Sequence, residues 1–154
     1  MTIYQFSASA LIQAPPQVLY AIIADYKQGH PQILPKPPFV SLEVEKGGIG
    51  AGTVFRAYMR LLGQLQTFRA LVTEPEPGRV LVETTDTGYV TTFTVDPRAD
   101  GQQANVTIAT QIARPAGMMG MLEYRVMAWL LRPTYVKELD QLAAVAATRI
   151  EEES

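Results

Sequence analysis

The period of the hydrophobic pattern changes once along this chain, and that change limits the possible folds most strongly. Apolar side chains recur at every second position in six segments, which are Val40–Lys46, Thr53–Leu61, Leu65–Glu74, Arg79–Asp86, Tyr89–Val95 and Ala104–Ala113. This alternation is typical of β-strands that bury one face. Short links rich in glycine, proline and polar residues separate the segments, so we expect consecutive antiparallel strands.

The last third of the chain has a helical period instead. Its apolar residues recur at steps of three or four, at Leu122, Val126, Trp129, Pro133, Val136, Leu139, Ala143, Ala146 and Ile150. This stripe predicts one long helix, or two nearly collinear helices, that bury it. Proline lacks a backbone donor and clashes with the carbonyl group four residues earlier, so we expect a kink at Pro133.

The start of the chain adds one strand and one short helix. Apolar residues alternate from Tyr4 to Ile12, and two prolines then precede a helical pattern that Gly29 ends. The whole pattern predicts a single α+β domain of residues 1–154, with a core from about residue 3 to residue 150 and a frayed acidic tail. Its architecture would be a curved antiparallel sheet of about seven strands around the C-terminal helix. One helix cannot fill the concave face of such a sheet, so we expect a cavity between them.

The composition disfavours several classes of function. The chain has 13 basic and 15 acidic residues, and its lysines and arginines are scattered singly, which disfavours binding to nucleic acid or to an anionic membrane. It has no cysteine and one histidine, so neither a disulfide nor a metal site is expected, and no cofactor is expected either. The N-terminus lacks the pattern of a signal peptide. The sequence therefore predicts a cytoplasmic monomer or homodimer without a membrane segment.

Three segments carry a family resemblance: "SALIQAPPQVLYAIIADY" (residues 9–26), "GGIGAGTVFRAYM" (47–59) and "VTEPEPGRVLVET" (72–84). They resemble the first strand and helix, the glycine-rich hairpin and the glutamate-proline-glycine turn of the START-like (SRPBCC) superfamily. This superfamily includes Bet v 1-type proteins and bacterial polyketide cyclase/dehydrase-like domains. The resemblance covers essentially the whole chain and implies the helix-grip fold. It also implies a ligand such as a lipid, polyketide, hormone or quinone, which some members only bind and others convert.

Three residues are candidates for acid–base chemistry in the cavity, namely His30, Glu83 and Tyr89. The ordinary pKa of histidine, about 6.5, suits proton transfer at neutral pH, but His30 lies in a proline-rich stretch that fits a packed loop equally well. If Glu83 points inward, desolvation raises its pKa and makes it a base. An exposed strand carboxylate is the alternative. The resembling family commonly has a tryptophan near this point, where the present chain has Tyr26 and then His30.

Inward-facing strand positions are expected to form an apolar wall that carries a few hydroxyl groups. The expected ligand-binding residues are Tyr26, His30, Phe55, Ala57, Met59, Phe68, Tyr89, Thr91, Phe93, Thr110, Met121 and Tyr124. Methionines in the first turns of the long helix would give a deformable surface for ligands of varied shape. Ordinary core packing is the alternative for each of these residues taken alone.

The sequence leaves three functions open. The first is binding of a small hydrophobic or aromatic molecule of the polyketide, lipid or isoprenoid class, with Gln28–Pro38 as an irregular lid and the glycine-rich tip Gly47–Gly52 as a gate. A strand pattern rather than a helix follows the glycines, so nucleotide binding is not expected. The second is a polyketide cyclase/dehydrase-type enzyme that uses acid–base residues in the same cavity. The third is a protein-interaction module with an exposed apolar patch and no ligand.

Overall fold

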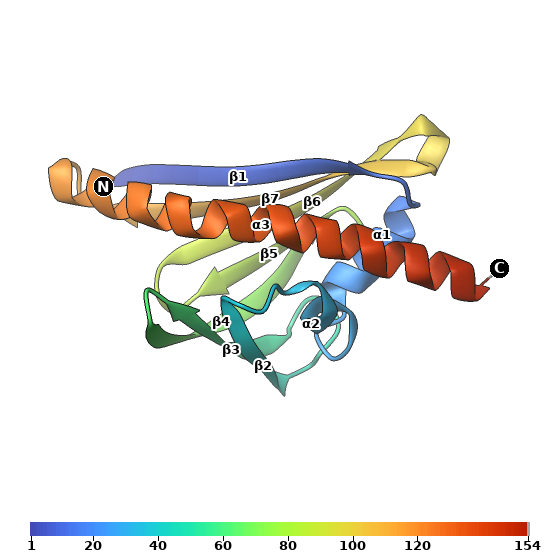
Figure 1. Ribbon diagram of the computed structural model, residues 1–154, viewed down its shortest axis with the longest axis horizontal. Coiled ribbons are helices and arrows are strands. Elements are labelled where there is room, and N and C mark those ends of the chain that lie inside the picture. Colours follow the sequence, from blue (N-terminus) through green and yellow to red (C-terminus); the bar gives the residue numbers. More distant parts are fainter. Residues whose placement is uncertain (154) are drawn as a thin grey trace.

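The structure, a computed structural model, describes residues 1–153 and places one long helix across a curved sheet (Figure 1). The strands are β1 (Thr2–Ile12), β2 (Phe39–Lys46), β3 (Val54–Leu61), β4 (Gln64–Glu76), β5 (Val80–Thr85), β6 (Tyr89–Arg98) and β7 (Gln103–Arg114). The helices are α1 (Pro16–Ala24), α2 (Gly29–Ile33) and α3 (Met118–Glu153), and a 3-10 turn, Ala99–Gly101, joins β6 to β7. The predicted α+β helix-grip fold is confirmed.

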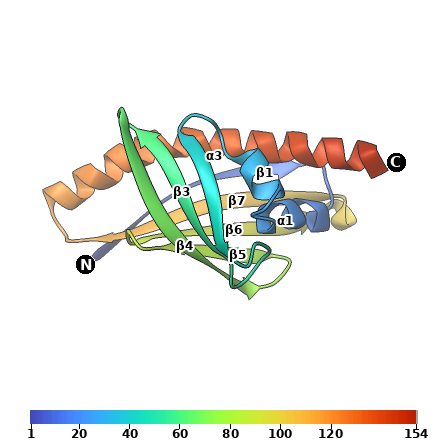
Figure 2. The same cartoon turned by 90° about the horizontal axis from the view of Figure 1, so that it is seen from below.

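All seven strands form one antiparallel sheet in the order β1-β7-β6-β5-β4-β3-β2, so β1 and β2 are its edges. From β2 to β7 each strand pairs with the next one along the chain, which is the predicted meander. The first strand pairs with the last along its whole length, from Thr2 opposite Arg114 to Ile12 opposite Ala104. Figure 2 shows β2, β3 and β4 running across the direction of β6 and β7, so the sheet is strongly curved.

Alternation along the strands decides which side chains reach the core. The buried, inward-facing positions of β3 and β7 include Phe55, Ala57, Met59, Val106, Ile108, Thr110 and Ile112. The residues between them are partly or fully exposed, as the period of two predicts. Each large apolar side chain that is fully buried contributes roughly 1.5–3 kcal/mol to the stability of the fold.

The helix α1 begins at the two prolines. Pro15 is extended and Pro16 occupies the first helical position, where a missing backbone N–H costs nothing. The helix ends at Ala24, and the Oδ1 of the next residue, Asp25, accepts hydrogen bonds from the backbone N–H groups of Lys27 and Gln28 at 3.1 and 3.2 Å. This turn leads the chain directly into α2.

The prediction of an irregular lid over Gln28–Pro38 is wrong at its centre. Residues Gly29–Ile33 form α2, in which Gly29, His30 and Ile33 are buried. A side chain at position 29 would lie 2.6 Å from the carbonyl oxygen of Ile22, so glycine lets α2 approach α1 closely. So short a helix depends on tertiary packing, here against α1 and α3, and local sequence signals do not reveal it.

The prediction of a mobile gate at Gly47–Gly52 is also wrong. Its backbone is hydrogen-bonded to the end of α1, because the N–H of Tyr26 donates to the carbonyl of Gly48 at 2.8 Å. The N–H of Gly50 donates to the carbonyl of Ala24 at 2.9 Å. Among the residues that the structure describes, none of this tip lines the cavity.

The helix α3 is continuous and contains Pro133, so the alternative of two separate helices is excluded. Figure 2 shows its first turns sloping away from the line of the rest, which is the kind of bend that a missing backbone hydrogen bond at proline produces. No helix in the described part of the chain is long and apolar enough to cross a membrane.

The predicted buried stripe of α3 is wrong for the first half of the helix. Leu122, Trp129 and Val136 are exposed, Trp129 to 72%. Of that stripe, only Leu139 and Ala146 are buried. The full set of buried α3 residues is Leu131, Thr134, Tyr135, Glu138, Leu139, Leu142 and Ala146. A helical period shows that apolar residues share a face, but it does not show which face the sheet covers when both carry apolar residues.

Candidate functional site

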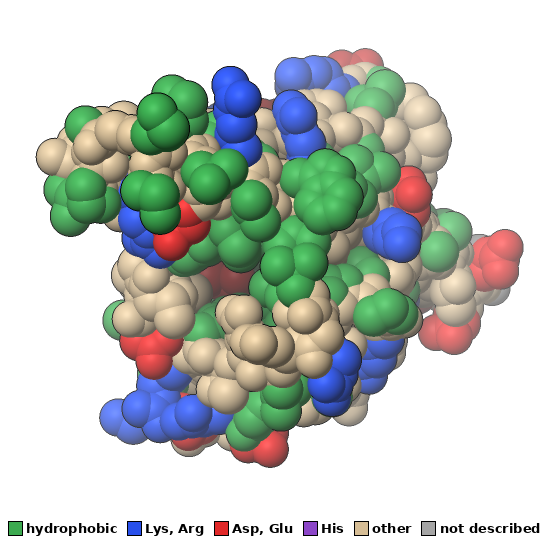
Figure 3. Space-filling view, turned by 60° about the vertical axis from the view of Figure 1, so that its left-hand side comes forward, with side chains coloured by type: hydrophobic (Ala, Val, Ile, Leu, Met, Phe, Trp, Pro, Cys, Tyr) green, Lys and Arg blue, Asp and Glu red, His purple; other side chains and the backbone are tan. Residues whose placement is uncertain are grey.

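The sheet, α2 and α3 enclose a cavity of about 330 Å³. Most of the residues that line it are apolar, including Leu34, Phe39, Leu42, Phe55, Ala57, Met59, Phe68, Phe93, Met127 and Leu131. Figure 3 shows the hollow that leads inward between hydrophobic side chains, with acidic atoms at its bottom. The cavity therefore has an apolar wall and a polar inner end.

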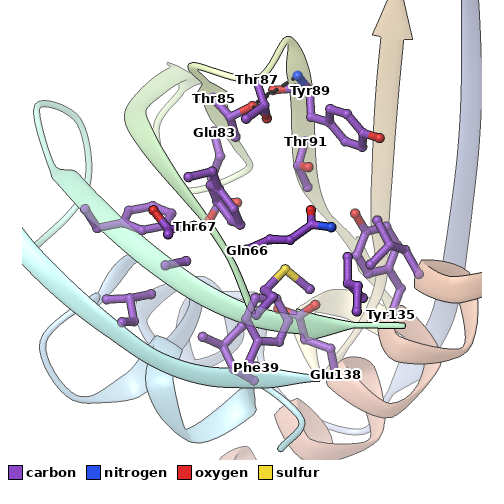
Figure 4. Close-up of a pocket in the computed structure, with 18 of the residues that line it drawn as sticks. Phe39, Gln66, Thr67, Glu83, Thr85, Thr87, Tyr89, Thr91, Tyr135 and Glu138 are labelled. Carbon is purple, nitrogen blue, oxygen red and sulfur yellow. Dashed lines mark hydrogen bonds between the residues drawn. The ribbon is translucent and has the colours of Figure 1, made fainter. Parts of the chain in front are cut away.

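The mouth of the cavity lies between the β5–β6 turn and the first turns of α3. Its exposed lining residues are Gln66, Thr67, Thr87 and Glu123. The carboxylate of Glu123 pairs with Arg114, and the guanidinium of Arg114 lies 5.6 Å from the ring centroid of Tyr89. Figure 4 shows Thr87 and Tyr89 at the end of the cavity opposite to Glu138.

His30 projects from α2 into the closed end of the cavity, where it is 2% exposed. Its Nδ1 lies 2.7 Å from the backbone oxygen of Ile23. A carbonyl oxygen only accepts, so Nδ1 carries the proton and Nε2 keeps a free lone pair. Burial lowers the pKa of His30 to about 4, although the hydrogen bond to Ile23 acts in the opposite direction. The imidazole is therefore neutral at neutral pH.

Glu83 reaches the same place from β5. Its Oε2 lies 3.6 Å from Nε2 of His30 and accepts a hydrogen bond of 2.6 Å from the hydroxyl of Tyr26. Burial raises the pKa of Glu83 to about 7, and the Tyr26 hydrogen bond opposes this shift. Because the imidazole is neutral, His30 and Glu83 do not form an ion pair at neutral pH. The ring of Tyr26 also stacks on His30, with centroids 4.3 Å apart, which holds the imidazole in place.

Glu138 approaches from α3, with its Oε1 3.9 Å from Nε2 of His30. Its side chain is only 3% exposed, and no hydrogen bond joins its carboxyl group to any residue that the structure describes. Burial raises the pKa of Glu138 well above its ordinary value of 4.5, and the nearby Glu83 raises it further. Figure 4 shows Glu83 and Glu138 reaching into the cavity from the sheet and from α3.

A row of hydroxyl groups flanks these acids. The hydroxyls of Thr91 and Thr110 are 2.7 Å apart, and Thr110 is also hydrogen-bonded to the hydroxyl of Tyr135. Thr91 and Tyr135 line the cavity, whereas Thr110 lies behind them. The row adds polar contacts for a ligand beside the apolar wall.

The charges that line the cavity have one sign. The carboxyl groups are those of Glu83, Glu123 and Glu138, and within residues 1–153 no lysine or arginine lines it. Arg114 balances Glu123 at the mouth, but no cation balances the deeper pair. The described residues include no cluster of His, Asp and Glu arranged to hold a metal ion.

The structure brings most of the predicted site residues together in this cavity, namely His30, Phe55, Ala57, Met59, Phe68, Glu83, Tyr89, Thr91 and Phe93. Two others lie directly behind its lining, since Tyr26 is hydrogen-bonded to Glu83 and Thr110 to Thr91. Both are fully packed rather than open to a ligand.

The predicted placement of Met121 and Tyr124 against the cavity is wrong. Met121 is 47% exposed, and Tyr124 stacks on Tyr4 of the edge strand β1. The cause is the rotation of α3, which turns its early methionines outward. Met127 alone among them lines the cavity.

Two residues that line the cavity, Glu138 and Tyr135, were not among the predicted site residues. Both stand on the helical face of Leu131 and Leu142, which lie seven residues before and four after Glu138 and are buried. An acid within such an apolar spacing was a usable signal for a buried carboxyl group. This signal was not used because the apolar residues in the stripe through Trp129 have equally regular spacing, and that stripe was predicted to be the buried one.

A family model described as polyketide cyclase/dehydrase and lipid transport matches residues 4–147. No protein with a curated description is significantly similar in sequence.

Solved structures of similar fold include three that span nearly the whole chain. The KanY protein is 24% identical, with a TM-score of 0.79, over 96% of this chain and 99% of that one. The Zhui aromatase/cyclase from Streptomyces sp. R1128 is 16% identical, with a TM-score of 0.75, over 97% and 96%. Ara h 8.0201 is 14% identical, with a TM-score of 0.63, over 96% and 99%. By the match of the family model over almost its full length, the chain belongs to the polyketide cyclase/dehydrase and lipid transport family, within the START-like (SRPBCC) superfamily.

Proposed function

We propose that this protein binds a small, mainly apolar molecule of the polyketide, lipid or isoprenoid class in the cavity beneath α3. The observation that carries the proposal is an apolar cavity of about 330 Å³ that ends in a few convergent polar groups. Ligand sites have this character, with volumes of about 300–1,000 Å³. The family description, which includes polyketides and lipids, supports the ligand class.

Burial of the ligand would supply the affinity, at roughly 25 cal/mol for each Å² of apolar surface removed from water. The wall offers Phe55, Phe68 and Phe93 for contact with an aromatic or branched ligand. Thr91, Tyr135 and the deep acids would set its orientation by hydrogen bonds.

Filling the cavity tests the proposal. Ala57 is buried and lines the cavity, so Ala57→Phe should lower the affinity for the neutral dye N-phenyl-1-naphthylamine by about tenfold or more. Ala109→Phe makes the same change on the outer side of β7 and should leave the affinity unchanged. Fluorescence titration measures both, and circular dichroism checks that both variants fold. Equal binding by the two variants would contradict a site in this cavity.

One observation favours a second function, acid–base catalysis on a carbonyl compound. The lone pair of His30 Nε2 and two buried carboxyl groups face the same closed end of the cavity. A neutral imidazole can take a proton from carbon next to a carbonyl group, while a carboxylic acid donates a hydrogen bond to the carbonyl oxygen. Exchange of the methyl protons of 2-acetonaphthone in D2O, followed by NMR, should then be faster with the wild type than with His30→Gln. Equal exchange rates with the two proteins would contradict acid–base catalysis by His30.

A further inference from the structure

We infer that the deep end of the cavity recognises the ammonium group of a small apolar or aromatic amine. The inference rests on the proposed function, since it requires a ligand in the cavity, and it specifies the polar group of that ligand. It follows from three acceptor groups that converge there from three elements: Nε2 of His30 on α2, Glu83 on β5 and Glu138 on α3.

Two of the hydrogens near this point are already donated to other groups. The Nδ1–H of His30 is donated to the carbonyl of Ile23, and the hydroxyl hydrogen of Tyr26 is donated to Glu83. The carboxyl group of Glu138 has no hydrogen-bond partner in the described chain, although its side chain is almost fully buried. The carboxyl oxygens face the cavity, because no described side-chain N or O atom that is fully buried lacks a partner. A ligand that brings donors to this point can therefore bond to Glu138 without breaking a hydrogen bond of the protein.

The spacing of the acceptors suits a donor placed among them. Nε2 of His30 is 3.6 Å from Glu83 and 3.9 Å from Glu138, which is too long for direct hydrogen bonds. The three groups therefore face one another without being bonded to one another. An alkylammonium group is compact and carries three N–H donors, one for each of these acceptors.

The charge of the cavity favours the same head group. With no lysine or arginine lining the described cavity, a carboxylate or phosphate would meet two buried carboxyl groups and no counter-ion. In the free protein, burial opposes negative charge at this point, because it raises the pKa of Glu83 to about 7 and that of Glu138 well above its ordinary value. An ammonium group would supply the missing positive charge and stabilise the ionised carboxylates, whereas an alcohol brings one donor and a ketone none.

Four matched naphthalene compounds test the inference on the full-length protein by calorimetry at pH 8: 2-(2-naphthyl)ethylamine, 2-(2-naphthyl)ethanol, 2-acetonaphthone and 2-naphthylacetic acid. The amine should bind about tenfold or more tightly than the alcohol, and the acid should bind weakest. If the alcohol, the ketone or the acid binds as tightly as the amine, the cavity holds ligands as proposed but the ammonium inference is wrong. If none of the four binds, both the proposed function and the inference fail.

A variant locates the preference. Glu138→Gln keeps the shape of the side chain but removes its charge, so the amine should lose its advantage over the alcohol while the alcohol still binds. Asp140→Asn makes the same charge change on the exposed side of α3, two residues away, and should keep the wild-type preference. An amine preference that survives Glu138→Gln, or that is lost equally in Asp140→Asn, overturns the assignment of Glu138.

Discussion

His30 shows how its surroundings decide the chemistry of a single side chain. In water an imidazole is about half protonated near pH 6.5, but His30 is enclosed by α2, the ring of Tyr26 and the inner end of the cavity. Desolvation disfavours the charged form more strongly than one hydrogen bond to Ile23 favours it. The residue is therefore a neutral base or hydrogen-bond acceptor rather than a cation. The proposed acid–base catalysis and the proposed recognition of an ammonium group both depend on this neutral state.

We predict that His30 titrates with a midpoint near pH 4, because burial lowers its pKa from 6.5 to about 4. The unfolded chain takes up this proton first, so the contribution of His30 to stability is present above pH 6.5 and is lost as the pH falls towards 4. The chain has one histidine, so its imidazole resonances are unambiguous in an NMR titration. A midpoint near 6.5 in the folded protein would contradict the buried position.

The helix α3 has one face that packs against the core and one face that is exposed to solvent. Leu139 and Leu142 are buried with Glu138, while Leu122 and Trp129 face outward in the first half. How much an apolar side chain contributes to stability depends on whether it is buried, and not only on its hydrophobicity. The exposed side is also where the predicted interaction module would have its apolar patch.

Matched substitutions on α3 should separate the two faces. Leu139→Ala leaves a hole against the core and should lower the free energy of unfolding by about 2–5 kcal/mol. Leu122→Ala removes the same atoms from an exposed position and should change it by less than about 0.5 kcal/mol. Denaturation in urea measures both values. Similar losses in the two variants would show that the first half of α3 is covered in solution.

In the whole molecule, a curved sheet packs around one helix and leaves a cavity beside it. β1 and β7 contact α3 directly, whereas β2 to β6 curve away and supply most of the cavity wall. The cavity is therefore a consequence of the architecture, while its polar inner end is a property of three particular residues. A ligand held there would contact both the sheet and the helix, so its binding should stabilise the fold as a unit.

We predict that N-phenyl-1-naphthylamine, at about 100 times its Kd, stabilises the protein by about 2.7 kcal/mol and raises its Tm by about 5–10 °C. The gain arises because the ligand binds the folded chain and not the unfolded one. Differential scanning calorimetry measures the shift, with Ala57→Phe as the control whose Tm should rise by about half as much or less at the same ligand concentration. A shift of equal size in that variant would place the binding outside the cavity.

The order and type of nearly all the elements could be read from the sequence, because hydrophobic period is a local property. The alternation in β1 and β2 to β7 and the helical period after Met118 are strong signals, and they led directly to a curved sheet, a gripped helix and a cavity. Alternation also predicted which side of β3 and β6 faces inward, since a strand has only two faces. The helix α2 was not predicted, because it has only five residues, one of them glycine and one proline, and so short a helix is stable only through packing.

Contacts between distant segments were decided by tertiary structure alone. A helix can turn about its axis without any change in its period, so the face of α3 that meets the sheet, and with it the place of Glu138, followed from packing. His30, Glu83 and Glu138 come from three elements far apart in the chain, and no local pattern marks their approach to one another. Burial then set their protonation, because the cost of a charge depends on the surrounding dielectric and partners and not on the residue type.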